Sequence, residues 1–267
     1  MVMAIKSIHV VILSSENDEY NAFKKVWIEN ILSIKKNNDI NYEFYFVYGG
    51  CNSFKIVNNG SYNDIFTTAP ETIHGMLDKT LQIFEHLYCH NTSGYVMRTN
   101  LSTLFNFNGL KKWFDNMPEL NLFGGSYING FSNKNTLISG VNMTISWDIL
   151  GDIVKHKRHL KNNLQKLNED IQISRFVFNT RNPLTKCMGR IDFLEKRITF
   201  HKCFSKDLSV YCFRFKSNNR ENDVVKMRKL LDSQFDTELF VRNCKLPIFQ
   251  EMPQYSKLFN KPFLAHV

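Results

Sequence analysis

GYVMRTNLSTLF, residues 94–105, is the stretch that decides the fold predicted from this sequence. It begins as a short apolar run, places Arg98, Thr99, Asn100 and Ser102 close together, and then turns apolar again. A strand that ends abruptly in polar side chains is typical of an α/β protein that carries its site at the carboxyl edge of a sheet. We therefore expect these polar residues to lie at such an edge.

Composition favours a folded protein with a large core. The chain has 267 residues, of which 43% are hydrophobic and 13% aromatic, and this apolar content can offset the loss of chain entropy on folding. We expect one domain over residues 1–267, with residues 235–267 as a tail packed on the core. No apolar run approaches the roughly 20 residues of a membrane-spanning helix. Residues 1–11 read as a first strand and not as a signal peptide, because no small-residue cleavage site follows them.

The cysteine spacing indicates the cellular compartment of the protein, and the net charge indicates which partners it could bind. The six cysteines show no C-x-x-C spacing, which favours free thiols in a reducing compartment and hence a cytoplasmic location. The net charge of +9 fits either a nucleic-acid face or a site for a small polyanion such as a nucleotide diphosphate. The one dense basic cluster, KHKRH at residues 155–159, is by default a solvated helix face. Because no signature of a nucleic-acid-binding module is present, we expect no nucleic-acid partner.

Strand and helix patterns alternate along the chain. Residues 8–15 form an apolar run typical of a strand buried on both faces, residues 18–36 an amphipathic helix, and residues 42–48 an aromatic strand. Strand, helix and strand in this order predict a parallel pair. Further strands are expected within 64–68, 94–105, 122–126, 137–146, 189–193, 198–201 and 210–217, and further helices within 73–87, 110–117 and 224–231, and from 147 and 169 onward.

This order of motifs, from Ile8 to Leu231, resembles nucleotide-sugar glycosyltransferases of the GT-A type, and in particular β-1,3-galactosyltransferase-like and viral or bacterial surface-glycan enzymes. In that family a buried strand runs into an Asp-x-Asp metal motif, and here Arg98-Thr99-Asn100 stands in its place. The resemblance implies a GT-A, Rossmann-like α/β fold with a mixed, mostly parallel sheet flanked by helices. It also implies a nucleotide-sugar donor, most commonly a UDP-sugar, and a glycan hydroxyl as acceptor.

Two acids, Glu169 and Asp170, open a predicted helix. The simplest explanation is that negative charge is favoured at a helix N-terminus. Galactosyltransferase-like enzymes, however, have a Glu-Asp-Val or Asp-Asp-Val motif at this place, in which an acid serves as base. The resemblance thus implies Asp170 as the catalytic base, with Glu169 as the second choice. A single in-line displacement assisted by Asp170 would invert the anomeric configuration.

Two further segments match the family in order and spacing. Residues 71–80 resemble the helix start that precedes the Asp-x-Asp strand, which implies a donor contact for Lys79; otherwise Lys79 is an exposed helix lysine. Ser139 and Gly140, with Ser146 at the matching distance, resemble a segment that lines the sugar and acceptor pocket. Without the resemblance this segment is an apolar strand with turn residues.

Two alternatives are open for how the departing diphosphate is stabilised. The family holds Mn or Mg as a Lewis acid, but Asn100 is a neutral, weaker metal ligand and Arg98 would repel a cation. Otherwise fixed cations replace the metal, since Arg214 and Lys216 share one face of a predicted strand and guanidinium binds phosphate through paired hydrogen bonds. The predicted donor-binding residues are Ser14, Lys79, Arg98, Thr99, Asn100, Arg214, Lys216 and Arg220.

Simpler alternatives stand beside this assignment. Arg98 could instead form a structural ion pair with a carboxylate such as Glu71. The whole domain could also be an inactive GT-A module that binds a nucleotide sugar or a glycan, and the missing Asp-x-Asp motif supports that reading. The sequence leaves the sugar, the nucleotide base, the acceptor and the oligomeric state open.

Overall fold

The computed structural model describes residues 6–34, 40–127, 137–163, 168–195, 198–201, 210–237 and 239–240. Most of the predicted tail, from residue 241 onward, lies outside these residues. The chain begins with strand β1 (Lys6–Leu13), helix α1 (Asp18–Ser33) and strand β2 (Ile40–Tyr48). Asn17 caps α1 by accepting from the Glu19 backbone N–H at 3.1 Å. β1 and β2 pair in parallel, so the predicted strand–helix–strand unit is confirmed.

The larger sheet has seven strands in the order β3-β4-β2-β1-β5-β8-β7. Its four neighbouring strands β4 (Asn63–Phe66), β2, β1 and β5 (Tyr95–Asn100) run parallel. β3 (Lys55–Asn58) and β8 (Met143–Ser146) run antiparallel to their inner neighbours, and the short β7 (Phe123–Gly124) pairs with β8. The predicted mixed, mostly parallel α/β sheet is confirmed.

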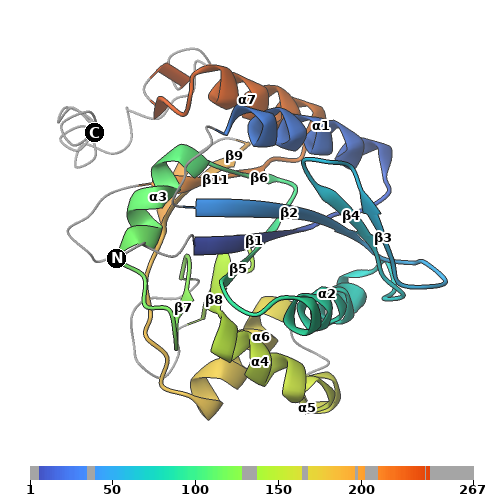
Figure 1. The fold of residues 1–267 in the computed structure, drawn as a ribbon. Helices are drawn as coiled ribbons and strands as arrows, with labels where there is room; N and C mark the ends of the chain where they lie inside the picture. The colour runs from blue at the N-terminus through green and yellow to red at the C-terminus, as the bar shows by residue number, and fades with distance from the viewer. Residues whose placement is uncertain are drawn as a thin grey trace.

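Helices cover both faces of this sheet (Figure 1). α1 and α7 (Arg220–Asp232) lie on one side, with α3 (Phe107–Asp115) near one end of the strands. The other side carries α2 (Met76–His90), which follows a 3-10 turn at Ile73–Gly75, and then α4 (Trp147–Lys155), α5 (Lys157–Asn163) and α6 (Glu169–Thr180). β1 sends Val10 and Ile12 into one hydrophobic cluster and Val11 into the other, so it is buried on both faces as predicted.

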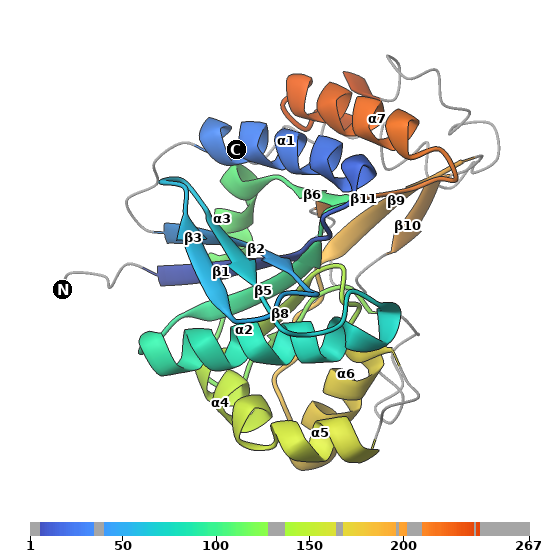
Figure 2. The same cartoon turned by 90° about the vertical axis from the view of Figure 1, so that its right-hand side faces the viewer.

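A second, smaller sheet has the order β10-β9-β11-β6 and lies beside α7 (Figure 2). Its strands are β6 (Thr103–Phe105), β9 (Gly189–Leu194), β10 (Ile198–His201) and β11 (Val210–Lys216). β5 ends at Asn100 and β6 begins at Thr103, so two residues separate a strand of the large sheet from a strand of the small one. The polar end of β5 and the start of β6 therefore form a corner between the two sheets.

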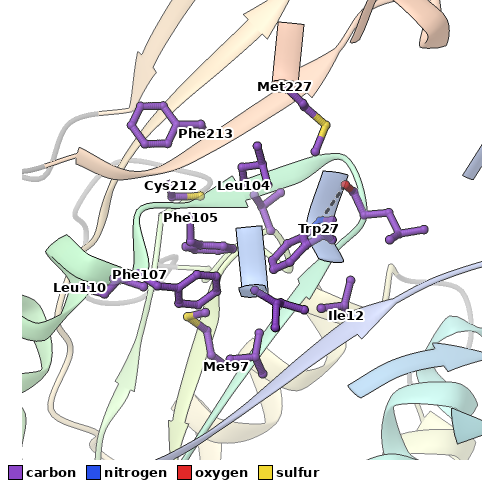
Figure 3. Packing of buried hydrophobic residues seen from close by; sticks show 14 of the residues in the cluster. Ile12, Trp27, Met97, Leu104, Phe105, Phe107, Leu110, Cys212, Phe213 and Met227 are labelled. Carbon is purple, nitrogen blue, oxygen red and sulfur yellow. Dashed lines mark hydrogen bonds between the residues drawn. The ribbon is translucent and has the colours of Figure 1, made fainter. Parts of the chain in front are cut away.

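Trp27 of α1 fixes the corner between the two sheets (Figure 3). Its indole N–H donates to the Leu101 carbonyl oxygen at 3.0 Å, and its ring lies 6.2 Å from that of Phe105. Leu104 of β6 and Met227 of α7 are fully buried in the same cluster. The stretch that follows the polar residues of β5 is thus held by packing, which positions those residues.

Residues 155–159 end α4 and begin α5, and most are exposed as expected, although Lys157 pairs with Glu85 of α2.

Cys51, Cys89 and Cys212 are free thiols, whereas the expectation of a free thiol is wrong at Cys187, which is disulfide-bonded. Spacing in the sequence does not reveal a pairing that folding creates. Within the described residues, no helix combines the length and the apolar character that crossing a bilayer demands.

Candidate active site

The parallel strands β1, β2 and β5 end together, and the residues after them form the candidate site. Ser14 follows β1, Gly49 follows β2, and Asn100 ends β5 beside Leu13. The Ser14 backbone N–H donates to Val47 O at 2.9 Å, which ties the first two strand ends together. Ligands of open α/β sheets bind at this carboxyl edge, so the predicted position of the site agrees with the fold.

Arg98 points from β5 toward the α2 and α6 side and pairs with Glu169 at the start of α6. Its Nε donates to Glu169 Oε1 at 3.0 Å, and its Nη2 donates to Oε2. The Thr80 hydroxyl adds a hydrogen bond to Oε1 at 2.6 Å. Both side chains are buried, at 2% and 3% exposure. Complete burial raises the pKa of the Glu169 carboxyl, and the charge of Arg98 and the Thr80 hydroxyl oppose this rise.

Gly140 lies between Arg98 and Asp170. Its carbonyl oxygen accepts from Arg98 Nη1, and its backbone N–H donates to Asp170 Oδ2 at 3.0 Å. A Cβ at this position would lie 2.5 Å from Arg98 Nη1 and 3.2 Å from Asp170 Cβ. The structure thus brings together Gly140 and both predicted acids, and only Asp170 of the two acids stays partly exposed.

Lys79, from its place on α2, joins the ends of β1 and β2. Its Nζ donates to the Ser14 carbonyl oxygen at 2.9 Å and to Glu71 Oε1 at 2.6 Å, and Gly49 N–H donates to Glu71 Oε2 at 2.6 Å. The side chain is 3% exposed, and burial lowers its pKa against the opposing effect of Glu71. The alternative of an exposed helix lysine is therefore wrong. Glu71 pairs with Lys79, so Glu71 is the wrong partner for Arg98, but the alternative of a structural ion pair between Arg98 and a carboxylate is confirmed, with Glu169 as that carboxylate.

Thr99 and Asn100 differ in what they offer a ligand. The Thr99 hydroxyl is fully buried and donates to Val141 O at 2.6 Å. Asn100 is partly exposed, but its Oδ1 already accepts from the hydroxyls of Ser102 at 3.0 Å and Thr103 at 2.9 Å. Arg98 pairs with Glu169, and Asn100 is neutral. Neither of these two positions, at which the resembling family has its acids, carries a carboxylate.

These residues do not fit a divalent cation. Mg and Mn prefer anionic oxygen ligands, whereas here the nearest candidates are a guanidinium and an amide oxygen that already has two donors. Among the described residues, no group of three or more His, Cys, Asp or Glu side chains is placed to hold a metal ion. No catalytic step is therefore assigned to a metal.

The predicted cations of β11 lie next to Asn100. Arg214 stands opposite Thr103 of β6 in the register, and Phe215 N–H donates to Ser102 O at 2.8 Å. Lys216 is exposed, while Arg214 is partly buried and faces Asp192 of β9, with 3.9 Å between Arg214 Nη1 and Asp192 Oδ2. Arg214 is therefore the predicted cation that lies at the corner of the two sheets.

The remaining predicted residues have local partners. Arg220 Nη1 donates to Asp223 Oδ2 at 3.2 Å and its guanidinium lies 5.9 Å from the Phe23 ring centre, so it braces the start of α7 against α1. Ser139 is 6% exposed; its N–H donates to Ser126 O at 2.8 Å and its hydroxyl accepts from the Val141 N–H at 3.4 Å. Ser139 thus shapes the loop that presents Gly140.

Sequence reasoning missed Arg190 and Asp192, which lie on β9 next to Arg214. Asp192 and Arg214 are partners in the register of β9 and β11. Two charged residues two apart in a strand share one face, and this alternation in Gly189–Phe193 was the signal that could have found them.

The fold is similar to that of the galactosyltransferase LgtC in complex with donor and acceptor sugar analogs. The identity is 10%, the TM-score is 0.50, and the match covers 85% of this chain and 95% of that chain. A glycosyltransferase involved in the glycosylation of the major capsid of PBCV-1 matches at 13% identity and a TM-score of 0.49, over 82% of this chain and 98% of the other. No protein-family model and no curated protein sequence matches this chain. At an identity of 10%, the likeness to LgtC shows a similar fold and nothing further.

Proposed function

We propose that this protein is a glycosyltransferase that moves a sugar from a nucleotide-diphosphate donor to a hydroxyl group of a glycan. The observation that carries the proposal is the fold shared with LgtC, whose structure holds donor and acceptor sugar analogs. Support comes from the polar residues at the carboxyl edge of β1 and β5, where open α/β sheets bind their ligands. A UDP-sugar is the first donor to test, and we propose a cytoplasmic location without a nucleic-acid partner.

Asp170 is the proposed base. It is partly exposed, whereas Glu169 is buried and both of its oxygens accept hydrogen bonds from Arg98. A general base must lie within reach of the proton that it removes. Each Asp170 oxygen accepts one backbone N–H, Oδ2 from Gly140 and Oδ1 from Ile171 at 3.0 Å, so it is the partial exposure of Asp170 that favours it over the buried Glu169. Asp170 would deprotonate the acceptor hydroxyl in one in-line displacement, which gives a product of inverted anomeric configuration.

The other predicted residues divide into two roles. Lys79 and Arg98 are buried and hold the strand ends and α6 in place, so they act as positioning residues. Arg214 and Lys216, on the strand next to Asn100, are the proposed contacts to the diphosphate, and Ser14 and Gly140 are proposed to line the donor and sugar sites. Electrostatic stabilisation of the departing diphosphate is the step in which a fixed cation contributes most.

Replacement of Asp170 by Asn tests the proposal. We expect Asp170→Asn to lower kcat for transfer by about 10²- to 10⁴-fold, because a general base typically contributes that much. The fold should persist, since the Asn carbonyl oxygen can still accept the Gly140 N–H. The measurement is sugar transfer from a panel of nucleotide sugars, with anomeric configuration of the product read by NMR.

Asp78→Asn is the matched control, because Asp78 forms a surface ion pair with Lys161 at 2.6 Å and lies outside the proposed site. It should leave kcat unchanged. An Asp170→Asn enzyme as fast as the wild type would refute the base assignment, and a product of retained configuration would refute the single displacement.

The second candidate function is a binding module without turnover. The observation that favours it is the buried Arg98–Glu169 pair at the position of the family's metal-binding acids. A module would show a higher melting temperature with a nucleotide sugar, because a ligand selective for the native state stabilises it. It would show no release of the nucleotide in the presence of any acceptor.

A further inference from the structure

The two faces of the small sheet differ in chemistry. Ile191, Phe193, Phe213 and Phe215 pack into the core beneath α7, with Phe193 and Phe215 stacked at 4.9 Å. Residues at the intervening positions share the opposite face, and these include Arg190 and Asp192 of β9 and Arg214 of β11. We call these three residues the small-sheet charge cluster.

Positive charge is in excess in the small-sheet charge cluster. Arg190 Nε lies 2.7 Å from Asp192 Oδ1, and Arg190 Nη2 donates to Asp192 Oδ2 at 3.1 Å. Arg214 Nη1 lies 3.9 Å from the same Oδ2. Among the residues that the structure describes, two guanidinium groups thus share the Asp192 carboxylate. Burial lowers the pKa of Arg214, and the charge of Arg190 acts in the same direction against the attraction of Asp192.

Three buried N–H donors in this cluster also lack a hydrogen-bond acceptor among the described residues. Arg190 is 5% exposed, and neither its Nη1 nor its Nε has a hydrogen-bond partner there, although Nε lies within ion-pair distance of Asp192; Arg214 Nε has no hydrogen-bond partner either. Buried polar groups are nearly always hydrogen-bonded, and an unpaired one costs about 1–3 kcal/mol. Excess positive charge together with unpaired donors indicates that the cluster is completed by an anion.

The cluster lies at the rim of the candidate active site. Arg214 stands opposite Thr103, and the Thr103 hydroxyl donates to Asn100 Oδ1 at 2.9 Å. Asn100 ends β5, two residues after Arg98 and beside the end of β1. Arg214 is the more exposed of the two arginines, with 24% of its side chain exposed against 5% for Arg190.

We infer that Arg214, backed by the buried charge of Arg190, forms an anion site for the diphosphate of the donor, and that this site replaces a divalent metal. The inference rests on the proposed function and adds Arg190 and metal independence to it. During transfer the bond from the anomeric carbon to the diphosphate oxygen breaks, and its electron pair stays on that oxygen. The acceptor oxygen forms the new bond and its proton passes to Asp170. Guanidinium groups meet the charge that develops on the diphosphate.

Calorimetric titration with UDP and with inorganic pyrophosphate in the presence of EDTA tests the site. Wild-type protein should bind both ligands without metal. Arg190→Met should weaken binding at least tenfold, whereas Arg190→Lys, which keeps the charge, should weaken it less than threefold. Arg228→Met is the control, because Arg228 is half exposed and pairs with Glu29 across α1 and α7, and it should bind like the wild type.

Several outcomes would overturn the inference. Binding that requires added Mn, or equal affinity of the Arg190→Met protein and the wild type, contradicts it. Thermal melting checks that each variant folds, and if Arg190→Met does not, Arg214→Gln at the more exposed partner takes its place with the same expected loss. Sugar transfer that requires Mn refutes the anion site and leaves the proposed function standing. Metal-free binding without transfer to any acceptor refutes the proposed function and leaves the anion site standing.

Discussion

Two arginine–carboxylate groups lie near the end of β5, and they differ in charge balance. Arg98 has one carboxylate, Glu169, whose two oxygens both accept from it, and the pair is buried and neutral. In the small-sheet charge cluster, Arg190 and Arg214 share Asp192. A buried arginine in this protein is therefore not in itself a sign of ligand binding. The two groups differ in how many arginines share one carboxylate: one at Glu169 and two at Asp192. The proposed anion site rests on that difference.

The largest effect should come from removing one charge of the neutral pair. Arg98→Met leaves Glu169 buried without its partner, and such a loss typically costs about 3–5 kcal/mol in the free energy of unfolding. Arg214→Met should cost less than about 1 kcal/mol, because Asp192 keeps Arg190 as a partner and the excess charge is relieved. Urea unfolding of the two variants measures the difference, and equal losses would remove the contrast between the groups.

A smaller effect should follow when Gly140 acquires a side chain. Gly140→Ala would place a methyl group 2.5 Å from Arg98 Nη1, and relief of such crowding costs about 1–3 kcal/mol of stability. Because Gly140 also binds Asp170, transfer activity should fall with stability. Gly60→Ala is the comparison: nothing lies within 4 Å of its added Cβ, and the cost of about 1 kcal/mol comes from its φ of +80° alone. A Gly140→Ala protein with full activity would show that the Arg98–Asp170 spacing is not critical.

The smallest effect concerns Glu43, an acid with a half-exposed side chain on β2. Hydrogen bonds from His9 and Tyr45 lower its pKa from 4.5 to about 2 against the opposing effect of burial. A depressed carboxyl pKa adds stability above the unfolded value of 4.5, and this is lost as the pH falls toward 2. Because 38% of the side chain is exposed, we expect about 1 kcal/mol or less.

Glu43→Gln should therefore flatten the fall in stability between pH 4.5 and 2, as measured by urea unfolding across that range. This variant serves as the reference for Arg98→Met, because it removes a partly solvated pair far from the end of β5. If Glu43→Gln shifts stability as much as Arg98→Met does, burial is not what distinguishes the Arg98–Glu169 pair.

Much of the fold could be predicted from the sequence because the central elements carry strong local patterns. The apolar run at residues 8–13 and the helix start at Asn17 and Asp18 predicted β1 and α1. The short strand β3 was missed and β6 was not separated from β5, because four or three residues carry too little periodicity to distinguish a strand from a loop. Their positions depend on pairing with distant segments.

The site was predicted less well, and the reason is sequence distance. Arg98 and Glu169 are 71 residues apart, and the nearer Glu71 was the alternative considered from sequence. Which acid meets which base depends on how α2 and α6 pack on the sheet, and local patterns carry no such information. Asp170 and Gly140 were predicted as site residues through the family resemblance, and their catalytic and binding roles stay predictions.

The corner at Leu101 and Ser102 has a mechanical consequence. With only these two residues between β5 and β6, and with the Leu101 carbonyl fixed by the Trp27 indole, there is no slack for one sheet to swing against the other at this point. We therefore expect Arg98 on one side and Arg214 on the other to keep their separation when a ligand binds. Any opening that a bulky ligand needs is expected to come from loops elsewhere on the molecule.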